Sequence, residues 1–449
     1  MMRSIPLFTF AGLFCMASWA SCPKAFAQEP AAPAATTPAE PAKPAEAPAK
    51  DSAPKSTAAA EAAQTPPKAA PKRDDFLKQP GAPRKPLENY RTTKQQTAQP
   101  PTGVKLEDLL RGNNPKDANI DAMAKANVFS ITKPGNEADR TILNELNRIA
   151  DGRGGANPDS VKAYKSALVK YLGQVLDNSI LVQVNALNLA SEIQNGSNDV
   201  SDSVALFLKV IDDDKKQDPV LFMALRGLVK ARDRGLVRAN EEQQAAGIIM
   251  KQLEKPDVQS MLKAKLIETL GALERPYLER PRDAKVATII AQAAIDPNND
   301  LEVRAAAGKA LARMRLSEIQ GWNSALQAQV IARALRDSFS QTPPEEVNQS
   351  KLQEAKRLNA YYWAKAIKKA STESPNQSNE DFKSFAQATA LDQLLFPILK
   401  RETENIDALS EWIDQHPISD KKLAPNAPEL TLEPAKAAEG ERADAGPSK

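Results

Sequence analysis

A repeated helical pattern constrains this chain more than any other feature of its sequence. From residue 137 to residue 338, apolar residues recur at helical spacing, and short turns with Pro, Asp or Asn interrupt them every 12–20 residues. No β-branched run long enough for a strand intervenes. The pattern predicts helices over 137–150, 159–177, 180–194, 200–211, 219–232, 239–253, 258–273, 283–295, 301–315 and 322–338.

Four of these helices share one apolar face that recurs at a nearly constant interval. Each face carries three apolar residues at positions 0, +4 and +8, and successive faces begin 38, 42 and 41 residues apart. A period near 40 with two helices per unit is typical of helical solenoids. Their small alanines let neighbouring helices approach closely. We expect the following residues to form the repeat core: Val182, Ala186, Ala190, Val220, Ala224, Leu228, Leu262, Leu266, Leu270, Val303, Ala307 and Leu311.

The segment 300–311, DLEVRAAAGKAL, resembles the first helix of a HEAT repeat, in which Val-Arg precedes an Ala-rich face that ends in Leu. Two other segments keep an apolar–polar pair without the Arg, and the one at Val220 departs further. The resemblance covers 137–338 and implies an all-α fold. The expected architecture is a right-handed α-solenoid of about five HEAT-like, armadillo-type helix pairs. Such repeats serve many functions, so the resemblance names no ligand.

The period is lost beyond Pro343 and Pro344, where helices are expected at 346–371, 380–402 and 405–415. An open solenoid end exposes apolar surface, so 345–416 is interpreted as a C-terminal helical cap. The aromatic cluster of Tyr361, Tyr362 and Trp363 in this segment has an alternative interpretation. Because Tyr and Trp are favoured at interfaces, these residues are a candidate partner-binding patch.

The N-terminus has the pattern of an export signal over 1–27. Arg3 supplies the positive charge that begins such a signal, and residues 5–19 form an apolar stretch too short to span a membrane. Residues 25–27 match the small-x-small motif that signal peptidase recognises. Cleavage is predicted between Ala27 and Gln28. Lipidation of Cys22 and an uncleaved anchor stay open as alternatives, and they alone would place the protein at a membrane. The pattern predicts an exported protein that is periplasmic, secreted or anchored in the envelope. It also indicates a bacterial source.

Two flanking segments have the composition of disorder. Residues 28–102 hold 15 of the 34 prolines and only two aromatic residues, so they cannot bury enough apolar surface to offset the entropy of ordering. We therefore expect a disordered Pro/Ala/Lys-rich arm over 28–102, an irregular lead-in over 103–136 and a disordered acidic tail over 425–449.

The sequence offers no convincing catalytic or metal-binding set. His416 is the single histidine, and both cysteines lie before the predicted cleavage point. Asp296, Asn298 and Asp300 have the spacing that begins a calcium loop, but Leu301 stands where that loop needs glycine. The chain has 60 Lys and Arg against 57 Asp and Glu, too balanced to predict nucleic-acid binding. We expect no catalytic, cofactor-binding or metal-binding residues, and no nucleic-acid or small-molecule partner.

Two functional hypotheses from different classes remain. The favoured one is a non-enzymatic exported scaffold that binds another, unidentified protein through its solenoid surface. The alternative is an envelope-anchored structural tether. A carbohydrate-active enzyme is a third option, because the many carboxylates could include a glycosidase pair, although no spacing singles one out.

Overall fold

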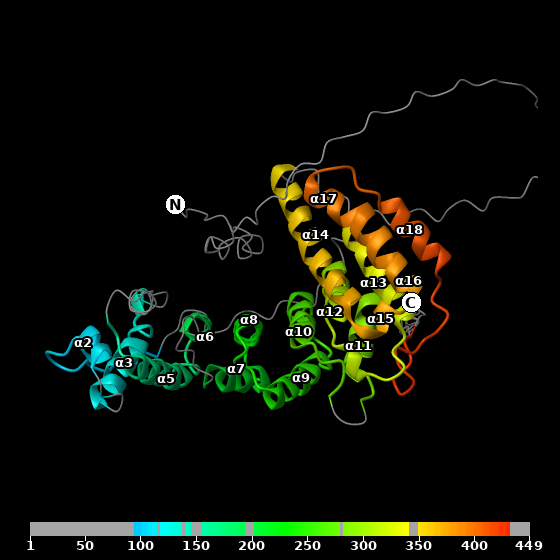
Figure 1. Cartoon of the computed structure of the whole chain (residues 1–449). Coiled ribbons are helices and arrows are strands. Elements are labelled where there is room, and N and C mark those ends of the chain that lie inside the picture. Colours follow the sequence, from blue (N-terminus) through cyan, green and yellow to red (C-terminus); the bar gives the residue numbers. More distant parts are fainter. Residues whose placement is uncertain are drawn as a thin grey trace, which may run out of the picture. The chain divides into compact units, whose positions relative to one another are not determined.

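The computed structural model describes residues 94–431, with gaps at 113, 115–116, 137–140, 143, 145–154, 194–201, 279–281 and 341–348 (Figure 1). The predicted signal (1–27), most of the arm and most of the acidic tail therefore lie outside the described residues. The same holds for nearly all of the helix expected at 137–150.

Every regular element in the described part of the chain is helical, which confirms the all-α class. The only β pairing described there is an isolated bridge between Lys422 and Glu429. The helices from 158 to 339 begin and end within a few residues of the predicted ones. They are α5 (Pro158–Gln174), α6 (Ile180–Ile193), α7 (Asp202–Asp212), α8 (Asp218–Asp233), α9 (Ala239–Leu253), α10 (Ser260–Leu273), α11 (Lys285–Ile295), α12 (Leu301–Leu311), the 3-10 turn η1 (Leu316–Glu318) and α13 (Ser324–Phe339).

Local sequence explains where several of these helices begin. Asn157 precedes Pro158, and its side-chain oxygen accepts hydrogen bonds from the next two available N–H groups, of Asp159 and Ser160. Pro at the first helical position loses no hydrogen bond, because that N–H has no partner in a helix. Asn323 caps α13 in the same way, accepting from the N–H of Leu326 at 2.9 Å.

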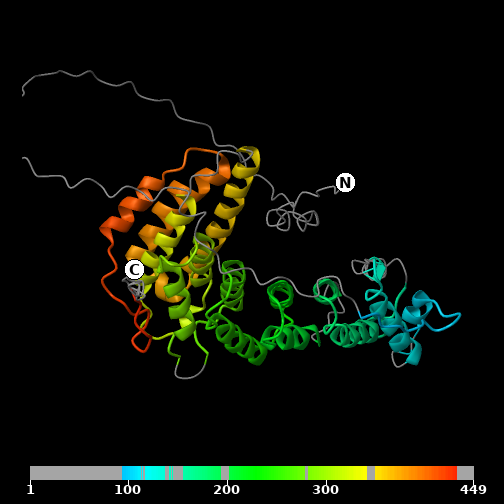
Figure 2. The same ribbon diagram turned by 180° about the vertical axis from the view of Figure 1, so that it is seen from behind.

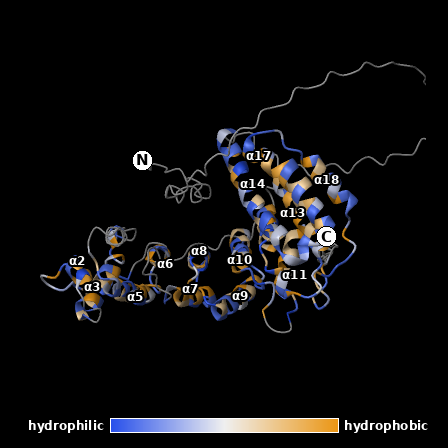
Figure 3. Ribbon diagram, viewed as in Figure 1, coloured by the Kyte–Doolittle hydropathy of each residue, from blue (hydrophilic) through white to orange (hydrophobic). Residues whose placement is uncertain are grey.

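The helices pack in two interleaved series. α6 contacts α8, α8 contacts α10, α10 contacts α12 and α12 contacts α14, while α5 contacts α7 and α7 contacts α9. Consecutive helices also pair, α7 with α8 and α11 with α12 among them (Figures 1 and 2). The backbones of α10 and α12 approach closely at Gly271, where an added Cβ would lie 2.6 Å from both Cα and Cβ of Ala310. Hydrophobic and hydrophilic residues alternate along the helices (Figure 3), and the buried hydrophobic ones form the core between them.

The N-terminal part of the described chain is more ordered than expected. The lead-in 103–136 contains α2 (Leu106–Arg111) and α3 (Ala118–Ser130). Apolar residues surround α3 rather than forming one stripe, so its sequence lacks the amphipathic pattern that would have announced it. The end of the predicted arm is also attached. Lys94 and Asn178 exchange hydrogen bonds of 3.0 and 2.7 Å, and the Gln96 N–H donates to Thr132 Oγ1 at 2.8 Å.

The C-terminal region is built differently. It comprises α14 (Gln349–Thr372), α15 (Ser374–Gln377), α16 (Glu380–Lys383), the π-helix η2 (Ser384–Leu395), α17 (Phe396–Lys400) and α18 (Ile406–Gln415). From 380 to 400 the helix is continuous through Pro397, which has no N–H for the carbonyl of Gln393. That carbonyl instead accepts from the N–H of Asn405 at 2.8 Å.

A final segment, 417–431, returns to the repeat helices. Leu423 and Leu430 are buried, and the Asn323 N–H donates to the carbonyl of Leu423 at 2.8 Å. The backbone of Thr431 exchanges two hydrogen bonds with the Gln292 side chain of α11, at 2.7 and 3.0 Å. Part of the predicted tail, 425–431, thus packs on the folded body.

Candidate interaction surface

The predicted repeat-core residues lie inside the protein. They occupy α6, α8, α10 and α12, and none of them is more than 5% exposed. These residues lie in the core that holds the helices together, so they are not accessible to a partner.

The aromatic cluster of α14 is divided between surface and core. Tyr361 is 52% and Tyr362 39% exposed, and their rings lie edge to face with centroids 5.5 Å apart. Trp363 is fully buried, with its ring over Gly308 of α12. The expectation that Trp363 offers a binding surface is therefore wrong. Successive residues of a helix point about 100° apart, so three neighbours cannot share one face.

The outward side of α8, α10 and α12 forms a connected surface next to the two tyrosines. On α10, Met261, Lys265 and Glu268 lie on one face by their spacing, and Met261 is 54% exposed. The Lys265 ammonium lies 5.5 Å from the ring centroid of Phe222 on α8 and 3.2 Å from the Glu268 carboxylate. We name these residues, together with Glu302 and Lys309 of α12, the α8–α12 surface.

The charges of this surface influence one another. Desolvation raises the pKa of Glu302, and the nearby carboxylates of Glu268 and Asp300 raise it further. Burial lowers the pKa of Lys309, whose ammonium has an Asn359 oxygen at 3.4 Å and the Trp363 ring at 5.8 Å. Burial also raises the pKa of Tyr362, with Tyr361 and Glu268 adding to the effect. The surface therefore continues from α10 and α12 to the exposed tyrosines of α14.

A partly buried charge cluster joins α8, α9 and the C-terminal end of α10 to α14. The Glu274 carboxylate accepts from Arg232 at 2.8 Å, from Arg315 at 3.2 Å and from Lys369 of α14, and Glu242 lies 3.8 Å from Arg232. Burial alone would raise the pKa of Glu274, but the bonds to Lys369 and Arg232 outweigh it and lower that pKa. No spacing in the sequence announced this cluster, because its members come from five separate elements.

Glu274 is also a backbone exception. It ends α10 with a φ of 62°, in the left-handed region where helices usually place glycine. A side chain in this conformation costs about 1 kcal/mol. Glycine would avoid that cost but would leave three cations without their carboxylate, which is a physical reason for glutamate here.

The residues weighed for chemistry serve local structure. Asp296 accepts from the Asn298 N–H at 2.9 Å within the turn between α11 and α12. The His416 ring stacks on Trp412 with centroids 4.2 Å apart, and its Nδ1 lies 2.8 Å from the Trp412 carbonyl oxygen. Among the described residues, no group of three or more His, Cys, Asp or Glu side chains is arranged to hold a metal ion.

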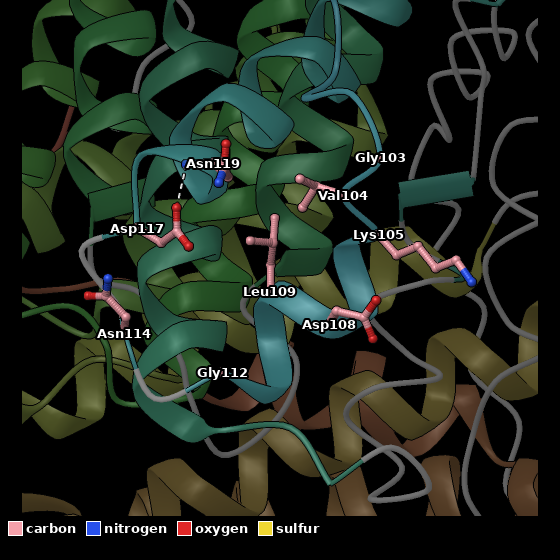
Figure 4. A pocket seen from close by; sticks show the side chains of 9 residues that line it. All are labelled: Gly103, Val104, Lys105, Asp108, Leu109, Gly112, Asn114, Asp117 and Asn119. Atoms are coloured by element: carbon pink, nitrogen blue, oxygen red, sulfur yellow. Dashed lines mark hydrogen bonds between the residues drawn. The ribbon is translucent and has the colours of Figure 1, made fainter.

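An open depression lies between α2 and the start of α3 (Figure 4). Its volume is about 340 Å³, and Asp108 and Asp117 are among its lining residues. Asp117 is already engaged, because its carboxylate accepts from the Asn119 N–H at 2.8 Å and caps α3. The depression is wide open and offers a ligand little enclosure.

Comparison with known protein families, with curated proteins and with solved structures finds no match. Of the helices in the described part of the chain, none is both long and apolar enough to cross a membrane.

Proposed function

We propose that this protein is an exported, non-enzymatic scaffold that binds another protein through the α8–α12 surface and the neighbouring tyrosines of α14. In this proposal the body is a right-handed HEAT-like solenoid of about five helix pairs with a C-terminal helical cap. The observation that carries the proposal is the surface itself, which joins an exposed methionine, exposed tyrosines and flanking charges over several helices.

The solenoid part of the proposal is supported by two independent features. The sequence repeats its apolar face every 38–42 residues, and the helices that carry those faces contact one another in order, α6 to α8 to α10 to α12. Stacked helix pairs present extended surfaces that suit protein partners. An apolar centre with polar neighbours is also the usual anatomy of an interface.

A pull-down with matched variants tests the proposed surface. The full chain is compared with a variant carrying Met261→Glu and Lys265→Glu, which changes the centre of the α8–α12 surface. A control variant carries Gln243→Glu and Gln244→Glu, at two exposed positions of α9. We expect a partner in envelope extracts that the wild type and the control retain and that the first variant loses at least about tenfold. A partner retained by all three forms, or none at all, would contradict the proposal.

Export and anchoring have a separate test. Cleavage of the predicted signal leaves Gln28 as the first residue, so the mass of the mature protein should correspond to 28–449. A lipid on Cys22 would instead support the alternative function, a structural tether held at a membrane by its N-terminus.

A further inference from the structure

The exposed face of α14 has a regular order of residues. Glu354, Leu358, Tyr361 and Lys365 follow one another at intervals of four, three and four residues, and all four are exposed. This spacing places them along one line of the helix, as in the contact seam of a coiled coil. We name these four residues the α14 face.

The α14 face is complementary to itself. Its centre is apolar, with Leu358 37% and Tyr361 52% exposed, and its ends carry opposite charges, Glu354 and Lys365. Within the described residues, neither of these two charged side chains takes part in an ion pair. A surface that is apolar in the middle and oppositely charged at its ends fits a rotated copy of itself.

We propose that the α14 faces of two copies of this chain pair in antiparallel orientation and make a homodimer. A two-fold axis between Asn359 and Ala360 sets Leu358 against the partner subunit's Tyr361, and Glu354 against the partner subunit's Lys365. Parallel pairing would instead set each charge against itself. The charges therefore select the antiparallel arrangement.

The flanks of the α14 face bear on the strength of this pairing. Lys351 would approach the partner subunit's Lys368, but the Lys368 ammonium already lies over the Phe396 ring of α17, 5.0 Å from its centroid. The helix of 24 residues is about 36 Å long, and a single helix pair buries a small interface. We expect a dissociation constant on the order of 10 μM, which makes the dimer sensitive to dilution.

Charge exchange at Glu354 and Lys365 tests the pairing in the full chain, by sedimentation from about 1 to about 100 μM. Glu354→Lys brings two lysines together at each end of the pair, and Lys365→Glu brings two glutamates together. Each variant alone should dimerise about tenfold more weakly than the wild type. A 1:1 mixture of the two, and the double variant, should return to within about threefold of wild type, because both restore opposite charges.

Leu358→Asp gives a second measurement at the apolar centre and should weaken dimerisation at least about thirtyfold. Circular dichroism checks that each variant stays helical. A wild type that is monomeric at every concentration overturns the proposal, as does a dimer that is indifferent to all four variants. Failure of the mixture to recover overturns the antiparallel arrangement. Tyr361 belongs to both proposed surfaces, but the pull-down variants leave α14 unchanged and the dimer variants leave α8, α10 and α12 unchanged, so the two proposals are tested separately.

Discussion

The helices α5–α13, where the sequence predicts a repeat, and the C-terminal region α14–α18 are packed by different means. In the repeat region small residues bring helices together, as at Gly271 and Ala310, and the large side chains are mostly aliphatic. In the C-terminal region a cluster of aromatic rings packs among the aliphatic core residues, with Phe385 between Phe382 and Trp412 at centroid distances of 6.1 and 5.2 Å.

This difference shows what a period does for a protein. Stacked units of similar length need a similar helix spacing each time. The C-terminal region follows no period and is packed by large rings whose positions depend on one another. Trp363 belongs to both regions, because it rises from α14 and packs on Gly308 of α12.

The largest expected effect comes from breaking that junction. Trp363→Ala removes a fully buried ring and should lower the free energy of unfolding by about 4 kcal/mol, measured by urea denaturation. Tyr361→Ala, two residues earlier on the exposed side, should change it by less than about 0.5 kcal/mol in dilute solution. Equal effects of the two substitutions would contradict the division of the cluster between core and surface.

A smaller effect is expected from the small-residue contact. Gly271→Ala places a methyl group against the backbone of α12 and should destabilise the protein by about 2 kcal/mol. Gly247 of α9 has open space where a methyl group would be added, so Gly247→Ala should stabilise by about 0.5 kcal/mol through helix propensity. Thermal unfolding should therefore give a lower melting temperature for Gly271→Ala and a higher one for Gly247→Ala. A Gly271→Ala variant as stable as the wild type would show that α10 and α12 can move apart at no cost.

The charge cluster at the boundary should make stability depend on pH. The pKa of Glu274 is lowered in the folded state, so its stabilisation is fully present above the ordinary glutamate pKa of about 4.3 and is lost as pH falls through the lower folded value. Glu274→Gln should cost about 2 kcal/mol at pH 7, since it leaves the partly buried Arg232 and Lys369 less compensated. The gap between wild type and variant should narrow below about pH 4. A gap that stays constant with pH would contradict a stabilising role for the ionised Glu274 carboxylate.

Sequence patterns predicted the repeat region well for a definite reason. A helix that buries one side must repeat apolar residues every three or four positions, and Val303, Ala307 and Leu311 announce α12 in this way. The same rule is weak for α3, whose apolar residues surround the helix. It is also weak for η2, where buried residues recur at intervals of four to five, as at Phe385, Ala390 and Leu395.

Less of the candidate surface could be predicted from the sequence. Their aromatic side chains marked Tyr361 and Tyr362 as candidate interface residues. Trp363 is also aromatic, but it is buried. Met261, Glu268 and Lys309 carried no signal, because an exposed methionine and a solvated charge look alike in sequence to their buried counterparts.

The sequence by itself determined that the described chain is helical, where most of its helices lie, and which residues hold α6, α8, α10 and α12 together. These features follow from local periodicity, because a helix that buries one side must repeat apolar residues at helical spacing. Only the tertiary structure decided which side of α14 stays open, that Glu274 gathers cations from separate elements, and that 417–431 returns to α11 and α13. Each of these depends on residues far apart in the chain, and only the packing of the helices brings them together.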